Sequence, residues 1–224
     1  MFKRFIFSVL AGVIGLGAFG QVALGDQPLR ILALGDSYTI GEGVDESERF
    51  PNQLGELLML KGYRIESIDI LAKTGWRTDE LIEAIGSANP ARDYDLVTLL
   101  IGVNNQYQKK KFKTFLREFR HLTDLAISLA GGRPDRVLVI SIPDYSYTPF
   151  GQKLDRPAKT SNEIHHYNRN NRIIAGQLGV RYVEITKISK ATLKDPSLLT
   201  TDGLHPSGKL YGQWAREIIR QLSL

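Results

Sequence analysis

The sequence contains no cysteine, and this absence excludes several kinds of chemistry. A chain without thiols forms no disulfide, builds no thiolate metal site and has no cysteine nucleophile. It also lacks the attachment point of a bacterial lipoprotein, whose lipid is bound to a cysteine. A domain of roughly 200 residues buries enough apolar surface to fold without disulfides, so this lack is compatible with export.

A strong charge and the motifs of nucleotide-binding proteins are also absent. The formal net charge is only +5, and the densest basic run, at residues 109–113, is predicted to be the solvated face of a helix. Weak attraction to an anionic membrane surface is the alternative for that run, and nothing else favours nucleic-acid binding. The chain has no phosphate loop and no dinucleotide spacing at residues 35–43. It also has no Gly-x-Ser-x-Gly nucleophile elbow.

The N-terminus has the pattern of a targeting segment. Residues 1–4 carry two positive charges, residues 5–25 are uncharged and largely apolar, and Ala23 and Gly25 place small residues before Asp26. This pattern is typical of a secretory signal peptide. An uncleaved membrane anchor through residues 5–25 is the alternative, because roughly 20 apolar residues can span a bilayer. We therefore expect an exported protein, periplasmic or secreted.

Beyond residue 28, short apolar runs alternate with amphipathic stretches. Strands are predicted at residues 29–34, 65–71, 96–101, 137–142 and 181–185. This alternation predicts one domain over residues 26–224, an α/β/α three-layer sandwich around a five-stranded, mainly parallel sheet. The segment 145–159 is the one long irregular stretch, and we expect it to border the functional site.

The helices between the strands are predicted from periodicity and capping signals. The first covers residues 50–61, and the second begins at Asp79 with Thr78 as its cap. A long helix follows Gly102 and continues to about residue 130. The fourth opens at a capping box, residues 160–163, and the last begins at Pro206.

Unusual polar residues follow the predicted strands. Gly-Asp-Ser stands at residues 35–37, Thr-Gly-Trp at 74–76, Gly-Val-Asn-Asn at 102–105 and Asp-Gly-Leu-His-Pro at 202–206. Each motif alone is compatible with a simple turn or helix cap. In an open parallel sheet, however, ligands lie outside the carboxyl ends of the strands. Together these motifs therefore predict a functional site at that edge.

The residue types in these motifs suit nucleophilic catalysis. A serine hydroxyl such as that of Ser37 needs a base to take its proton, and His205 can be that base. Asp202 lies three residues earlier, so one turn could direct its carboxylate at the imidazole. The oxyanion formed by attack needs fixed donors, which the backbone N–H groups of Ser37 and Gly75 and the amide of Asn104 could supply.

With these motifs in order, the chain resembles the SGNH hydrolases, also called GDSL esterases and lipases, from Leu29 to Leu224. The resemblance implies a flavodoxin-like sheet, no metal or organic cofactor, a Ser37, His205 and Asp202 triad, and an oxyanion hole of Ser37, Gly75 and Asn104. Two positions depart from the family pattern. Tyr38 replaces the leucine of the GDSL name, and Asn105 stands where many members have aspartate. Neither position performs the chemistry, so these departures bear on the substrate.

The predicted function is hydrolysis of small-chain or lipid esters through an acyl-Ser37 intermediate. The expected partner is a small-molecule ester or lipid. O-acetyl groups on carbohydrates are the alternative substrate, and a non-catalytic binding protein on the same fold is the rival from another class. Aromatic residues flanking the motifs are candidates for a substrate pocket, the alternative being ordinary packing; they are Tyr38, Trp76, Tyr107, Tyr145, Tyr147 and Phe150.

Overall fold

A parallel five-stranded sheet forms the centre of the structure, a computed structural model that describes residues 27–222. The strand order is β2-β1-β3-β4-β5, and each neighbouring pair is parallel. The predicted sandwich is therefore confirmed, with a sheet that is wholly parallel. The strands are β1 (Leu29–Gly35), β2 (Ile65–Ala72), β3 (Leu96–Leu100), β4 (Val137–Ile140) and β5 (Arg181–Val183).

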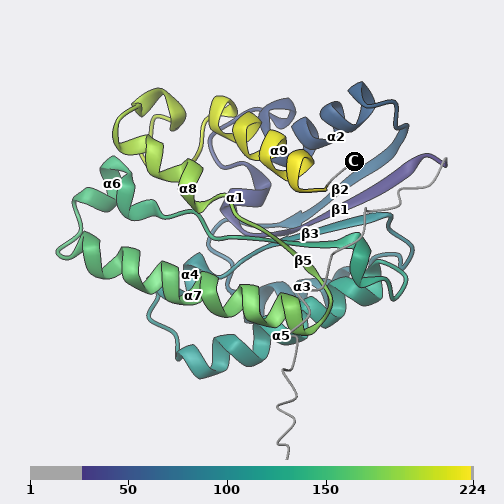
Figure 1. Cartoon of the computed structure of the whole chain (residues 1–224). Coiled ribbons are helices and arrows are strands. Elements are labelled where there is room, and N and C mark those ends of the chain that lie inside the picture. Colours follow the sequence, from purple (N-terminus) through teal and green to yellow (C-terminus); the bar gives the residue numbers. More distant parts are fainter. Residues whose placement is uncertain (1–26, 223–224) are drawn as a thin grey trace, which may run out of the picture.

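Helices cover both faces of the sheet (Figure 1). One face carries α2 and α9, and the other carries α3, α5 and α7. The α-helices are α1 (Ser37–Ile40), α2 (Phe50–Leu60), α3 (Thr78–Ala88), α4 (Val103–Tyr107), α5 (Phe112–Leu129), α6 (Pro149–Gln152), α7 (Pro157–Gln177), α8 (Thr186–Ser189) and α9 (Gly208–Leu222). Short 3-10 turns lie at Glu46–Glu48, Pro134–Arg136, Tyr145–Tyr147, Lys190–Leu193 and Pro196–Leu198.

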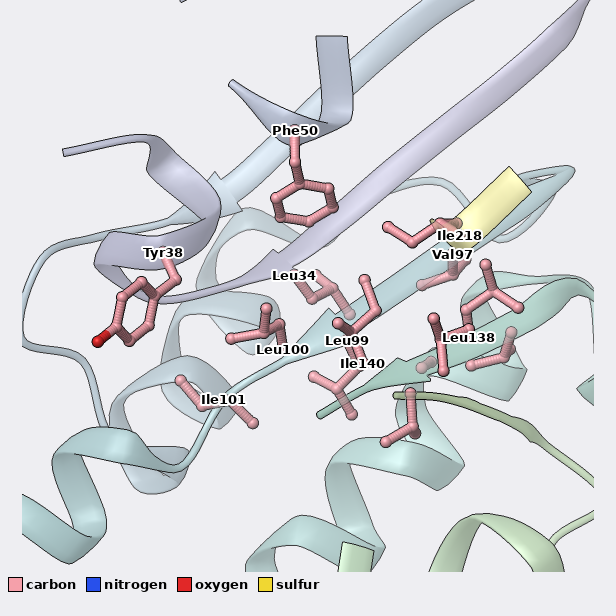
Figure 2. Packing of buried hydrophobic residues seen from close by; sticks show 14 of the residues in the cluster. Leu34, Tyr38, Phe50, Val97, Leu99, Leu100, Ile101, Leu138, Ile140 and Ile218 are labelled. Atoms are coloured by element: carbon pink, nitrogen blue, oxygen red, sulfur yellow. The ribbon is translucent and has the colours of Figure 1, made fainter. Parts of the chain in front are cut away.

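The core forms where apolar helix stripes meet the sheet. Every residue of β3 and β4 is buried, as expected for central strands covered on both sides. Figure 2 shows buried side chains of β1, β3 and β4, including Leu34, Leu99 and Ile140, in one apolar cluster. Trp214 of α9 is fully buried, which holds the C-terminal helix and the preceding loop firmly against the sheet.

The predicted long helix after Gly102 is wrong, because two helices, α4 and α5, occupy that stretch. Between them Lys109 has a φ of +56°, in the left-handed region that a continuous α-helix does not use. The break ends α4 at Tyr107 and leaves the side chain of that residue exposed beside the site.

Three predicted helix starts are also wrong. Helix α3 begins at Thr78 itself, and the Thr78 hydroxyl donates to Glu118 at 2.6 Å instead of capping the helix. Helix α7 begins at Pro157, because proline loses no hydrogen bond at a first helical position, so the predicted box lies inside the helix. Helix α9 begins at Gly208, after Pro206 has formed an isolated bridge with Leu199.

The segment 145–159 is more ordered than predicted, since it contains a 3-10 turn, α6 and the start of α7. The predicted signal peptide or anchor, residues 1–25, lies outside the described residues. Within residues 27–222, no helix is long and apolar enough to cross a membrane.

Candidate active site

The segments at the carboxyl ends of the strands form an open pocket of about 230 Å³. It brings together Ser37, Gly75, Asn104 and His205, which lie far apart in the sequence. Four of the six candidate pocket aromatics also line it, namely Tyr38, Tyr107, Tyr145 and Phe150, whereas Trp76 and Tyr147 do not. The lining residues are Ser37, Tyr38, Thr74, Gly75, Val103, Asn104, Tyr107, Tyr145, Phe150, Leu204 and His205.

Ser37 stands at the start of α1, directly after β1. Asp36 caps this single turn, with its Oδ1 accepting the N–H of Tyr38 at 3.1 Å. The turn needs glycine before it, because a Cβ at Gly35 would lie 2.5 Å from the carbonyl oxygen of Leu100. The local sequence therefore holds the serine hydroxyl at one end of the sheet, on a backbone packed against its neighbours.

His205 and Asp202 form a tightly hydrogen-bonded pair. His205 Nδ1 lies 2.6 Å from Asp202 Oδ2, and the side chain of His205 is 11% exposed. A carboxylate only accepts, so Nδ1 carries a proton, and in the neutral ring Nε2 has a free lone pair. The ring of Tyr38 lies 5.7 Å from the imidazole, centroid to centroid, and restricts its movement.

The carboxylate of Asp202 is fixed by further donors. Its Oδ1 accepts from the Thr200 hydroxyl at 2.7 Å and from the backbone N–H groups of Leu204 and His205 at 2.8 and 3.0 Å. Partial burial acts to raise the pKa of Asp202, but the hydrogen bonds from His205, Thr200 and the backbone outweigh it and lower the pKa to about 2. The carboxylate is therefore ionised and oriented at neutral pH.

The Ser37 hydroxyl has no hydrogen-bond partner among residues 27–222. It lines the same pocket as His205, and catalytic hydrogen bonds are often longer before substrate binds. The arrangement thus supplies a hydroxyl and an imidazole ring to one pocket.

Three donors are available for an anion in this pocket. Within the described part of the chain, the backbone N–H groups of Ser37 and Gly75 make no hydrogen bond. Gly75 has a φ of +85°, a conformation that favours glycine. The Asn104 amide donates one of its two hydrogens to the Trp76 carbonyl at 2.9 Å and retains the other.

Sequence reasoning missed a hydrogen-bond clamp behind these donors. Asn105 is buried, accepts the Thr78 backbone N–H at 3.1 Å and donates to the Thr78 hydroxyl at 2.7 Å. It thereby ties α4, which carries Asn104, to the start of α3, shortly after Gly75. The only signal in the sequence was the presence of asparagine where the family pattern has aspartate.

Sequence reasoning also assigned no role to the carboxyl group of Asp36, which is fully buried. Burial raises the pKa of Asp36 to about 7, although the hydrogen bond from the Tyr38 N–H acts in the opposite direction. Its Oδ2 has no partner within residues 27–222. Ser37 therefore adjoins a carboxyl group that is difficult to ionise.

A comparison with known protein families shows to which family this chain belongs. The sequence profile described as the GDSL-like lipase/acylhydrolase family matches residues 33–212. The chain belongs to this family. The match includes all the residues that converge on the pocket, so the resemblance found in the motifs is confirmed. No curated protein matches the sequence.

Solved structures similar to this member of the GDSL-like family share its fold. A lipase/acylhydrolase from Enterococcus faecalis is 18% identical, with a TM-score of 0.64 over 87% of this chain and 95% of the other. The acetyl xylan esterase AlAXEase is 19% identical, with a TM-score of 0.65 over 86% and 98%. Axe2, an acetylxylan esterase from Geobacillus stearothermophilus, is 18% identical, with a TM-score of 0.63 over 88% and 94%. At these identities the likeness shows the fold alone.

A metal role for the histidines of this GDSL-like protein has no support in the structure. His165 and His166 are exposed on α7, and no three His, Asp or Glu side chains among residues 27–222 lie close enough to hold a metal ion. That the protein needs no metal or organic cofactor stays a prediction.

Proposed function

We propose that this chain is a serine carboxylic ester hydrolase that acts through an acyl-Ser37 intermediate. The observation that carries the proposal is the convergence of Ser37 and His205 on one pocket, with the imidazole held by Asp202 at 2.6 Å. Membership of an acylhydrolase family supports the reaction class.

In the first half-reaction, Ser37 Oγ attacks the ester carbonyl carbon while His205 Nε2 takes the hydroxyl proton. The carbonyl oxygen becomes an oxyanion, for which the backbone N–H groups of Ser37 and Gly75 and the Asn104 amide are the donors. When the tetrahedral intermediate collapses, the bond to the alcohol oxygen breaks, and His205 gives its proton to that oxygen.

In the second half-reaction, His205 takes a proton from water, and the resulting hydroxide attacks the acyl carbon. The bond to Ser37 Oγ then breaks, the serine recovers its proton from His205 and the carboxylic acid leaves. The Asp202 carboxylate stabilises the imidazolium that exists transiently in each half-reaction.

A fluorophosphonate probe tests the proposal, because it reacts with activated serines only. Wild-type protein should be labelled and should hydrolyse p-nitrophenyl acetate, and Ser37→Ala should lose both properties. Ser197→Ala is a matched control, since Ser197 is an exposed serine outside the pocket that also follows an aspartate cap. A wild-type protein that is neither labelled nor active would be a non-catalytic binding protein.

The acyl and alcohol parts of the natural ester are a finer proposal. Small-chain or lipid esters fit the apolar lining of the pocket, and O-acetyl esters of carbohydrates are favoured by two structural relatives described as acetyl xylan esterases. Rates on p-nitrophenyl esters of increasing acyl length separate these substrates. A sugar deacetylase should lose activity beyond acetate, whereas a lipid esterase should retain it.

Export is proposed from the N-terminal pattern alone. N-terminal sequencing of protein recovered from the periplasm or the medium should begin at Asp26 if the segment is cleaved. A protein that retains residues 1–25 and sediments with membranes would instead be anchored.

A further inference from the structure

A second cavity, of about 690 Å³, opens beside the active-site pocket. The two cavities share Tyr107 and Tyr145, so these two rings form the wall between them. The second cavity lies between the end of α4 and residues 154–163, a stretch that includes the first turns of α7. We refer to it as the side groove.

The two tyrosines of the shared wall differ in exposure, since one is buried and hydrogen-bonded and the other is accessible to solvent. Tyr145 is buried, and its hydroxyl donates to Gln106 Oε1 at 2.8 Å. Tyr107 is 51% exposed, and its ring centroid lies 6.2 Å from that of Tyr145 in an edge-on arrangement. The exposed ring therefore offers a broad, rigid surface at the point where the two cavities meet.

Apart from Leu154 and the two tyrosine rings, the lining of the side groove is polar and carries charges of both signs. It includes the cations of Lys109, Arg156 and Lys159. It also includes the carboxylates of Asp155 and Glu163. Arg156 pairs with Asp155 at 3.2 Å and Lys159 with Glu163 at 3.8 Å, but all four side chains are more than 40% exposed. Such exposed pairs are weak, so these groups can exchange partners for a ligand at little cost.

The two cavities differ in what they can accept. The pocket beside Ser37 has apolar walls from Val103, Phe150 and Leu204, and at about 230 Å³ it is smaller than the roughly 300–1,000 Å³ of pockets that enclose drug-sized ligands. A long acyl tail would exceed this volume, and one path beyond the pocket leads into the side groove. There it would strip water from charged groups and return no hydrogen bonds.

We propose that the side groove is the binding site for the alcohol half of the substrate, and that this alcohol is rich in hydroxyl groups, as a sugar is. The inference rests on the proposed function, because it assigns the two cavities to the two halves of an ester. A short acyl group occupies the pocket at Ser37, one face of the sugar ring packs on Tyr107, and its hydroxyl groups bond to Arg156 and Lys159.

Because the alcohol leaves before deacylation, a groove that binds the alcohol can affect only the acylation step. During acylation the Ser37 Oγ–acyl bond forms, the bond from the acyl carbon to the alcohol oxygen breaks, and that oxygen takes the proton from His205. The alcohol then leaves, so an acetyl-enzyme is the same species whichever acetate ester produced it. Contacts in the groove should therefore change kcat/KM, which reports acylation, and leave the rate of deacylation unaltered.

The test compares two acetate esters whose alcohols have similar shape, methyl 6-O-acetyl-glucopyranoside and cyclohexylmethyl acetate. Wild-type kcat/KM should favour the sugar ester by about tenfold or more, as expected when charged donors meet hydroxyl groups. The double variant Arg156→Ala/Lys159→Ala should reduce this ratio to near one. Tyr107→Ala should reduce it as well, and Tyr107→Phe, which keeps the ring, should restore most of it.

Arg117→Ala is the matched control, because Arg117 is an exposed arginine of α5 outside both cavities, and this change should leave the ratio intact. A wild-type ratio near one, or groove variants that lower both rates equally, would overturn the inference while the esterase function stands. A wild-type protein that hydrolyses neither ester and takes up no fluorophosphonate would instead refute the proposed function itself.

Discussion

Replacing Asp202 by asparagine tests the triad with little change in shape. Asp202 Oδ1 accepts from the Thr200 hydroxyl and two backbone N–H groups, at 2.7, 2.8 and 3.0 Å. An asparagine at this position must keep its carbonyl oxygen on those three donors, because an NH₂ group there would face only other donors. Its NH₂ group is then directed at His205.

That orientation fixes the wrong form of the imidazole. Nδ1 of His205 would have to accept a hydrogen bond, so the proton moves to Nε2, which can no longer take the proton of Ser37. The expected loss in kcat/KM is about 10⁴-fold, the size of effect seen when a triad histidine is held in the wrong tautomer. KM for a small ester should change little, because Asp202 does not line the pocket.

The same substitution should have a small effect on stability. Lowering the pKa of Asp202 from 3.8 to about 2 would correspond to about 2.4 kcal/mol at neutral pH. Because the side chain is 43% exposed, solvent screening reduces this to about 1 kcal/mol. The contribution is present above the unfolded pKa and is lost as pH falls toward 2, so Asp202→Asn and wild type should converge in acid.

Initial rates with p-nitrophenyl acetate at pH 8, together with urea unfolding, measure both effects. Asp195→Asn is the matched control, because Asp195 Oδ1 also accepts from the backbone two residues later but lies outside the pocket. An Asp202→Asn enzyme within tenfold of wild type would refute the triad, and so would a control that loses as much activity.

Two further predictions concern the neighbours of Ser37. Asn104→Ala removes one anion donor and should lower kcat by about 10²- to 10³-fold with little change in KM, measured on the same ester; an unchanged kcat would remove Asn104 from the oxyanion hole. Burial raises the pKa of Asp36 to about 7, so the folded state holds a proton that the unfolded state releases above about pH 4. Wild-type unfolding free energy should therefore fall between pH 4 and 7 by up to about 1.4 kcal/mol per unit. Asp36→Asn, which keeps the acceptor for Tyr38, should lose this slope in urea titrations, and equal slopes would contradict the assigned pKa.

Much of the fold followed from local sequence. The apolar runs that form β1 and β3 are long enough to predict buried strands, and their alternation with amphipathic stretches predicted the sandwich. The predictions that failed concerned where individual helices begin and end. The helix after Gly102 broke because Lys109 adopts a left-handed φ, and the predicted start at Thr78 was wrong because its hydroxyl bonds to Glu118, a partner forty residues away.

Some features of the candidate site could be predicted from the sequence, and others required the fold. The pair of Asp202 and His205 could be predicted from the sequence, since a single turn joins residues three positions apart. The proximity of Ser37, Gly75 and Asn104 followed only once a parallel sheet was assumed, because parallel strands bring their carboxyl ends to one edge. The side groove had no sequence signal, as Tyr107 and Arg156 belong to segments that meet only through packing.

The sequence by itself determined which residues the proposed chemistry depends on, because a candidate nucleophile, base and carboxylate are recognised by residue type and short spacing. Tertiary structure alone decided the space around that chemistry. The size of the pocket, the wall shared by Tyr107 and Tyr145, and the charges beyond it depend on how α4 and α7 pack, and cavities arise from the contacts of distant segments that no local pattern encodes.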